Sequence, residues 1–127
     1  MQFLSLSAVL RIHALLISET GGQPGLRDRG LLASALKAAE HRYYYEQVDA
    51  VGCAAAYAYH LCMAHAFVDG NKRVAAAVTE TFLLQNGYSL ALDNSSVVAL
   101  FLDIARGQLT RASVETTLRR CTQQSGG

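Results

Sequence analysis

Apolar residues in this chain recur at intervals of three and four positions, the spacing that gathers them on one face of an α-helix. The alternation with a period of two that marks a half-buried strand is hard to find over any useful length. The first segment has a single apolar stripe made by Leu6, Val9, Leu10, His13, Leu16 and Ile17. Gly21 and Gly22 end it, as glycines do at helix C-termini. The pattern predicts an all-α protein.

Further helices are expected along the chain. One starts after Asp28, a good N-cap residue, and carries apolar positions from Leu31 to Leu36. Residues 41–47, with three tyrosines in a row, break that pattern and are predicted to be irregular and partly exposed. The segment 50–64 is apolar nearly all round, so it should be the central, buried helix. The last three helices are expected at 71–86, from a cap at Asn94 to Gly107, and at 110–122.

Length and composition agree with one compact domain. A chain of 127 residues with 51% hydrophobic residues, 17% charged residues and one proline is globular rather than disordered. We expect the domain to cover residues 1–122 and the tail 123–127 to be frayed. The predicted fold class is therefore a compact single-domain helical bundle.

Charge and cysteine content exclude several functions. A net charge of +1 gives no general attraction to nucleic acid or to a membrane surface. No apolar run approaches the ~18 to 20 residues needed to span a bilayer, and the N-terminus lacks the features of a signal peptide. Three cysteines without a CxxC pair suit free thiols in a reducing compartment. We therefore expect a cytoplasmic protein with no direct role for nucleic acid.

Most of the chemistry lies in nine residues, His65–Arg73 (His-Ala-Phe-Val-Asp-Gly-Asn-Lys-Arg), between two alanine-rich helices. The first turn of a helix has unpaired N–H groups and a positive dipole end, which together bind anions. Gly70 lets a phosphate approach the backbone, and Asn71 can cap the helix or donate to a phosphate oxygen. Lys72 and Arg73 add two positive charges. The run predicts an anion site at a helix start.

Three other residues of the run refine this prediction. Asp69 would repel a phosphate unless a cation separated them, and Mg²⁺ prefers carboxylate and phosphate oxygens. His65 is suited to take a proton near neutral pH, and Phe67 is expected to anchor the loop in the core. Each residue also has an ordinary explanation as a structural histidine, a turn or solvated surface, and spacing alone leaves that alternative open. Together they favour a nucleotide with a metal ion over free phosphate.

The nine residues resemble the signature of the Fic/Doc (Fido) family, in particular its death-on-curing (Doc-type) branch. The resemblance extends to Gly21–Asp28, Leu31–Leu36 and Phe82–Tyr88, and so covers nearly the full length of the chain. It implies the Fido fold, a compact all-α bundle, in agreement with the periodicity.

The resemblance also implies a role for each residue of the run. His65 would be the general base toward a side-chain hydroxyl of a target protein. Asp69 would be the catalytic carboxylate that holds Mg²⁺ at the phosphates of ATP. Phe67 would be the buried loop anchor. The nucleotide-binding loop and helix start would consist of Gly70, Asn71, Lys72 and Arg73.

Two positions depart from the Fic pattern. Lys72 stands where Fic enzymes have a glycine after the asparagine, and Ala76 stands where they have a second arginine. Doc-type toxins resemble this chain at both positions and are associated with transfer of the γ-phosphate of ATP to elongation factor Tu. The resemblance therefore implies a protein kinase that inhibits translation. A Fic-like adenylyl or nucleotidyl transferase and an inactive module that only binds an antitoxin remain as alternatives.

Restraint of the activity is expected to come from another chain, because the sequence lacks a Fic-type inhibitory motif of the form Ser/Thr-x-x-x-Glu-Gly/Asn. The resemblance implies a cognate antitoxin whose C-terminal segment folds as a helix in a groove. Four further residues are assigned structural roles. His13 lies on an apolar stripe, His60 is not spaced for a zinc site, and Arg27 and Asp28 are expected to form an ion pair or a cap.

Overall fold

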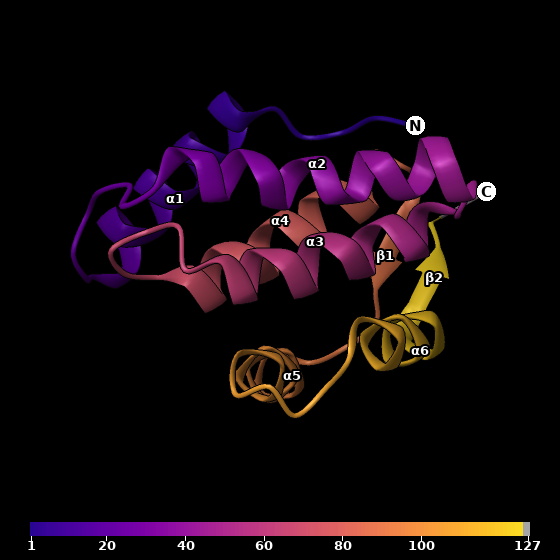
Figure 1. Ribbon diagram of the computed structural model, residues 1–127. Helices are drawn as coiled ribbons and strands as arrows, with labels where there is room; N and C mark the ends of the chain where they lie inside the picture. The colour runs from indigo at the N-terminus through magenta and orange to yellow at the C-terminus, as the bar shows by residue number, and fades with distance from the viewer. Residues whose placement is uncertain (126–127) are drawn as a thin grey trace.

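A computed structural model describes residues 1–125 and shows six helices packed into one body (Figure 1). The helices are α1 (Leu6–Thr20), α2 (Arg29–Glu46), α3 (Ala50–Ala64), α4 (Asn71–Gln85), α5 (Asn94–Ala105) and α6 (Arg111–Cys121). Two short strands, β1 (Tyr88–Leu90) and β2 (Thr122–Gln124), pair antiparallel. The predicted all-α, single-domain bundle is confirmed.

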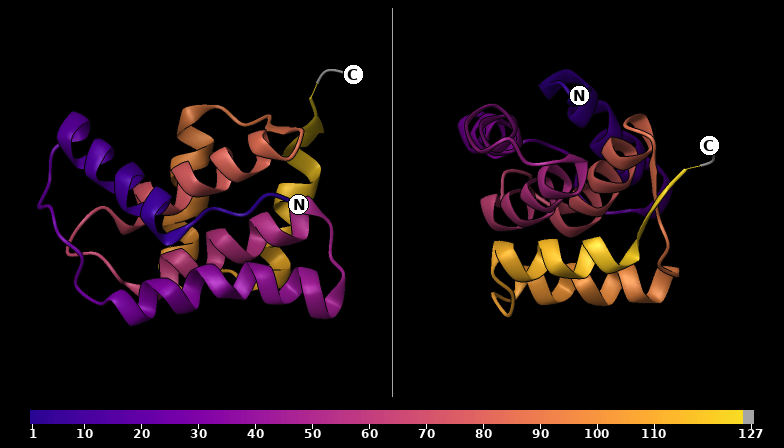
Figure 2. Two further views of the ribbon diagram at one scale, coloured as in Figure 1. Left: turned by 90° about the horizontal axis from the view of Figure 1, so that it is seen from above. Right: turned by 90° about the vertical axis from the view of Figure 1, so that its right-hand side faces the viewer.

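The apolar segment α3 is the central helix, as its composition predicted. Every residue from 50 to 58 is buried, and α2, α4, α5 and α6 all pack against it. Figure 2 shows α5 and α6 as a separate layer that crosses α2, α3 and α4 steeply. The small side chains of α3 allow its neighbours to approach closely, so one helix can be covered on several sides at once.

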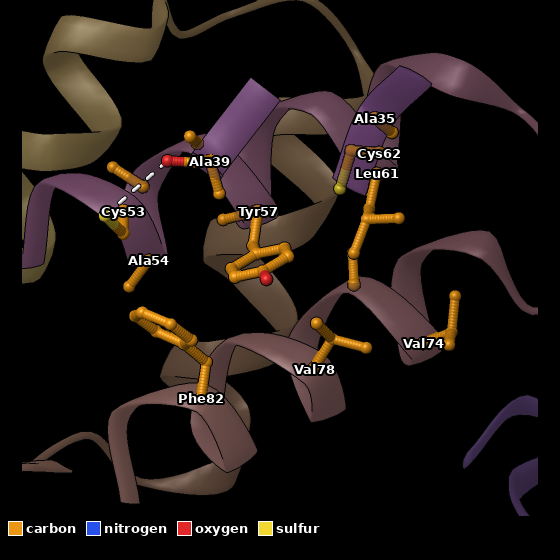
Figure 3. Packing of buried hydrophobic residues seen from close by; sticks show 14 of the residues in the cluster. Ala35, Ala39, Cys53, Ala54, Tyr57, Leu61, Cys62, Val74, Val78 and Phe82 are labelled. Carbon is orange, nitrogen blue, oxygen red and sulfur yellow. Dashed lines mark hydrogen bonds between the residues drawn. The ribbon is translucent and has the colours of Figure 1, made fainter. Parts of the chain in front are cut away.

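Aromatic and branched side chains fill the space between α3 and α4. Figure 3 shows Val74, Val78 and Phe82 of α4 directed toward Tyr57 and Leu61 of α3. The rings of Tyr57 and Phe82 lie 5.0 Å apart between centroids. The buried Tyr57 hydroxyl accepts a hydrogen bond from the backbone N–H of Leu4 at 3.2 Å, so its polar atom does not remain unsatisfied in the core.

The predicted irregular segment 41–47 is instead the last part of α2, which continues to Glu46. The prediction was wrong because the inward side chains of this segment are not aliphatic. Arg42 pairs with Glu115 on α6 at 2.8 Å, and the ring of Tyr43 packs on Phe3. The next two tyrosines are exposed, as expected.

Two predictions at the C-terminal end also need correction. Asp93, rather than Asn94, caps α5, because its carboxylate accepts from the N–H of Ser96 at 2.8 Å. Gln123 and Gln124 of the tail predicted to fray belong to β2, in which Gln124 pairs with Tyr88, while residues 126–127 lie outside the described part of the chain. Three-residue strands joined across more than thirty positions leave no local alternation in the sequence, which is why they were missed.

The remaining features bear on cysteine chemistry and membrane association. Cys53, Cys62 and Cys121 are free, and the first two are buried on α3. Burial raises the pKa of the Cys53 thiol to about 11 and that of Cys62 to about 12. Across residues 1–125, the structure has no helix with the length and apolar character needed to cross a membrane.

Candidate active site

The nine-residue run His65–Arg73 connects α3 to α4, at the end of the molecule opposite the chain termini (Figure 1). His65 ends α3 in the left-handed region, with φ 48°, and its side chain is exposed. Ala66 and Phe67 are buried immediately after it, so Phe67 anchors the loop as predicted. The loop is therefore fixed in the middle and open to solvent at His65.

The start of α4 has the properties of an anion site. Gly70 is the N-cap residue, with φ 78°, and no side chain of residues 1–125 caps this helix. The first backbone bond of the helix runs from the N–H of Val74 to the carbonyl of Gly70 at 2.9 Å. The three preceding amides, at positions 71–73, have no partner within the described chain and project from the positive end of the helix.

Asn71 does not cap α4, contrary to one of the two roles predicted for it. Its side-chain oxygen accepts from the N–H of Phe67 at 3.0 Å, and its amide nitrogen donates to the carbonyl of Phe67 at 3.0 Å. Asn71 thus holds the bend of the loop together. One amide hydrogen of Asn71 remains for a ligand, because the nitrogen carries two.

Asp69 is held as an ionised carboxylate beside this helix start. One oxygen accepts from the N–H of Gln23 at 3.1 Å, and the other accepts from the N–H of Gly70 at 2.8 Å. These two backbone hydrogen bonds lower the pKa of Asp69, with a smaller contribution from the charge of Arg73, whose guanidinium lies 3.7 Å away. The side chain is 46% exposed, so its oxygens keep capacity for a cation.

The two predicted phosphate-binding cations differ in their surroundings. Lys72 is exposed, and it forms no ion pair with any residue that the structure describes. Arg73 turns toward the end of α1, where its guanidinium donates to the hydroxyl of Thr20 and to the carbonyl of Gly21, the latter at 2.8 Å. Only Lys72 is therefore uncommitted in this conformation, and Arg73 would have to exchange partners to contact a ligand.

The glycine-rich segment 21–28 binds along the run and fixes its shape. The carbonyl of Ala66 accepts from the N–H groups of Arg27 at 2.7 Å and Asp28 at 3.0 Å, and the N–H of Val68 donates to Gly25 at 3.1 Å. The guanidinium of Arg27 also donates to the carbonyl of His65. These contacts hold His65 in a backbone conformation that costs free energy for a residue with a side chain.

The roles predicted for two residues of this segment are thereby settled. Asp28 is the N-cap of α2, since its carboxylate accepts from the N–H of Leu31 at 3.0 Å, so the predicted cap is confirmed. Arg27 bonds to a backbone carbonyl rather than to the carboxylate of Asp28. Its contact with His65 was not predicted, because a carbonyl acceptor carries no signal in the sequence.

His13 contacts the run from α1, which the sequence analysis did not anticipate. It is buried, and its Nε2 lies 2.7 Å from the carbonyl oxygen of Asp69. Because a carbonyl only accepts, Nε2 carries the hydrogen. The imidazole also stacks on the ring of Phe67, with centroids 3.8 Å apart and planes 14° from parallel. The structural role predicted for His13 is confirmed, and its partner is the candidate active-site loop.

Gly22 is a second residue whose importance the sequence did not reveal. A Cβ at this position would lie 2.5 Å from a carboxylate oxygen of Asp69 and 3.1 Å from the guanidinium of Arg73. The backbone of Gly22 has φ 118°, which side chains rarely adopt. The absence of a side chain therefore creates the space in which Asp69 and Arg73 meet.

The donor set fits a nucleotide with a divalent cation. An ionised, half-exposed carboxylate at Asp69 is a hard oxygen ligand of the kind that Mg²⁺ uses together with phosphate oxygens. The amides of residues 71–73 and the exposed ammonium of Lys72 complement phosphate oxygens beside it. His65 lies at the opposite end of the same loop, exposed to solvent.

Fold and site together place the chain in a known class: it belongs to the Fic/DOC family, whose model matches residues 3–83, from before α1 to near the end of α4. Among its relatives is the protein named Protein kinase doc, from Escherichia phage P1. The two are 31% identical over 121 residues, which cover 94% of this chain and 95% of that protein. Toxin Doc of Mycolicibacterium smegmatis is 44% identical over 77 residues, or 58% of each chain.

Proposed function

We propose that this protein is a Doc-type toxin, a protein kinase that transfers the γ-phosphate of ATP to a hydroxyl side chain of a translation factor of the elongation factor Tu class. The observation that carries this proposal is the uncapped start of α4, with the ionised carboxylate of Asp69 beside it and an exposed histidine at the other end of the loop. The name of the phage P1 relative, Protein kinase doc, supports the reaction class, and the name of the mycobacterial relative, Toxin Doc, supports the assignment as a toxin.

The residues divide the proposed reaction between them. The amides of residues 71–73, with Lys72, bind the phosphates of ATP and offset the charge that spreads over the transferred group. Mg²⁺, held by Asp69, would neutralise phosphate charge and orient the phosphate chain. His65 accepts the proton of the attacking hydroxyl. Phosphoryl transfer depends mostly on positioning, and the contacts of the glycine-rich segment supply that positioning for His65.

Two residues favour transfer of the γ-phosphate over transfer of a nucleotide. Lys72 places a long cationic side chain in the first turn of α4, close to where the inner phosphates of a nucleotidyl donor would lie. Ala76, one turn further along the helix, offers a methyl group where a second phosphate-binding cation would be needed. Nucleotidyl transfer remains the second candidate, since the same loop and histidine serve both reactions.

Labelled ATP distinguishes the two reactions. The purified protein is incubated with elongation factor Tu and ATP that carries the label on either the α or the γ phosphate. The proposal expects label on the acceptor from the γ position only. Label from the α position only would establish nucleotidyl transfer, and no label from either would refute both. The His65→Ala variant should lose the transfer, whereas Arg106→Ala, which removes an exposed cation after α5, should keep it.

The proposed physiological effect is inhibition of translation in the cytoplasm, held in check by a cognate antitoxin. Expression of the chain alone should arrest growth, and expression of the antitoxin from a neighbouring reading frame should relieve the arrest. His65→Ala and Asp69→Ala should both abolish the arrest while the variants still bind the antitoxin. Arrest by the His65→Ala variant at the wild-type level would instead support a binding module without turnover.

A further inference from the structure

A groove of about 410 Å³ lies between α2 and α3. Its α3 wall ends at Met63 and Ala64, the two residues that precede His65. Its α2 wall begins at Leu31, in the first turn of α2 after the glycine-rich segment that binds the loop. Figure 1 shows α2 and α3 side by side, with the loop and the segment at the same end. The groove therefore ends at residues adjacent to His65 in the chain.

The end of the groove nearest His65 is apolar. Leu31 is 42% exposed on one wall and Met63 is 40% exposed on the other. Both walls thus present a large apolar side chain to solvent, one on each side of a concave surface. Such a pair favours a partner that inserts an apolar side chain between Leu31 and Met63, because binding would then remove the apolar surface of all three side chains from water.

The other end of the groove is polar and carries no negative charge. Lys37 and His41 of α2 are exposed there, and no carboxylate lines the groove in the part of the chain that the structure covers. The Nε2 atom of His60 is buried and has no hydrogen-bond partner among residues 1–125. Burial, followed by the charges of Arg111 and Arg42, lowers the pKa of His60. Because the Nε2 atom is buried, it is not accessible to a docked partner, and the polar character of this end of the groove comes from Lys37 and His41.

The position of the groove relative to the anion site decides what it accommodates. The start of α4 faces the end of α1, where Arg73 contacts Thr20 and Gly21. The groove instead extends away from His65 between α2 and α3. In phosphoryl transfer the attacking hydroxyl and the leaving nucleotide lie roughly in line on opposite sides of the phosphorus. If the nucleotide binds at the start of α4, the acceptor hydroxyl therefore approaches from the side of His65 on which α2 and α3 lie.

We propose that the groove between α2 and α3 binds the segment of the protein substrate that carries the acceptor hydroxyl. The segment that fits has an apolar side chain close to the hydroxyl residue, for the space between Leu31 and Met63, and an acidic side chain further along, for Lys37. This inference rests on the proposed kinase function and adds to it a recognition surface and the chemistry of the preferred sequence.

Steady-state phosphorylation of elongation factor Tu tests the inference with matched substitutions. Met63→Gln removes an apolar wall, and Lys37→Glu reverses the charge at the polar end. Each should raise the KM for the protein acceptor about tenfold, a typical effect of removing a central interface contact, with the KM for ATP unchanged. The controls are Leu15→Gln, at a 59% exposed leucine of α1, and Arg106→Glu, at an exposed cation after α5.

Each possible outcome is informative. Unchanged acceptor KM values in both variants would overturn the inference while leaving the kinase function intact. A higher KM for ATP, with the acceptor KM unchanged, would assign the groove to the nucleotide base and also overturn it. If the wild-type chain phosphorylates no acceptor, the proposed function fails first, and the inference fails with it. Thermal unfolding of the variants, whose changed residues are exposed, verifies that the fold is retained.

Discussion

Replacement of His13 by phenylalanine isolates the hydrogen bond that joins α1 to the carbonyl of Asp69. The phenyl ring keeps the size, the burial and the stacking on Phe67, whose ring lies 3.8 Å from that of His13. It loses the N–H that donates to the carbonyl at 2.7 Å. The matched variant is His13→Gln, which keeps an N–H donor at a similar reach and loses the ring. The two variants therefore separate the hydrogen bond from the packing.

The magnitude follows from the environment of the carbonyl. An acceptor left without its partner in a buried site costs about 1 to 3 kcal/mol, and this hydrogen bond is partly buried, so the lower half of the range applies. We expect His13→Phe to lose roughly 1 to 2 kcal/mol of unfolding free energy. Loss of an interaction that orients a metal ligand lowers metal affinity by about 10- to 100-fold, and the proposed role of Asp69 in holding Mg²⁺ makes it such a ligand. We expect His13→Phe to lower the affinity for ATP in the presence of Mg²⁺ by about tenfold, the lower end of this range.

Two assays measure these effects. Calorimetry gives the ATP affinity of each variant in Mg²⁺ and in EDTA, and the ratio reports the metal-dependent part. Amide hydrogen exchange of residues 66–73 in the ligand-free protein reports the loop itself, independently of any activity. We expect His13→Phe to lower the affinity ratio and speed exchange, and His13→Gln to stay close to the wild type in both. The reasoning is refuted if the glutamine variant is the more perturbed, because packing would then matter more than the hydrogen bond.

Three further outcomes follow from the structure. Gly22→Ala should lower the ATP affinity in Mg²⁺ at least about tenfold by displacing Asp69, whereas Gly21→Ala should not: both glycines have positive φ, but a Cβ at Gly21 meets nothing within 4 Å. Burial raises the pKa of Tyr57 to about 12, so its contribution to stability is complete below pH 10 and is lost as the pH rises toward 12, measurable by denaturant unfolding across that range. The Cys53 thiol should react with alkylating reagents at pH 8 only after unfolding, as mass spectrometry would show, because burial raises its pKa to about 11.

The fold was predictable wherever the local pattern and the final packing agree. The segment 50–64 is apolar on nearly every side and became the buried centre of the bundle. The segment 41–47 was not predictable in this way, because its inward-facing Arg42 pairs with Glu115, 73 positions away in the sequence. In the sequence, an inward-facing charged residue interrupts the apolar stripe of a helix, and only the structure shows the partner that makes its burial possible.

The candidate site shows the same division. Its chemical groups are contiguous in the sequence, so spacing and helix electrostatics were enough to predict an anion and nucleotide site in the run from His65 to Arg73. The contacts that set the geometry of the run come from other segments. Asn71, for example, was expected at the helix start, but the loop itself uses its side chain to close a bend at Phe67. The sequence does not indicate whether the side chain of Asn71 bonds to the backbone of the loop or to a ligand, and only the three-dimensional structure shows the bonds to Phe67.

The first helix has a larger part in the site than its position in the sequence suggests. His13 holds the carbonyl of Asp69, Thr20 holds Arg73, and Ile17 lies 3.2 Å from where a Cβ of Gly70 would be. Each contact fixes a different residue of the run, and all three come from one face of α1. A chain that kept all nine residues of the run but lost this face would keep the chemical groups without their geometry. The run is therefore a necessary but insufficient signature of the site, and a diagnostic pattern for an active member should include the face of α1 together with the run.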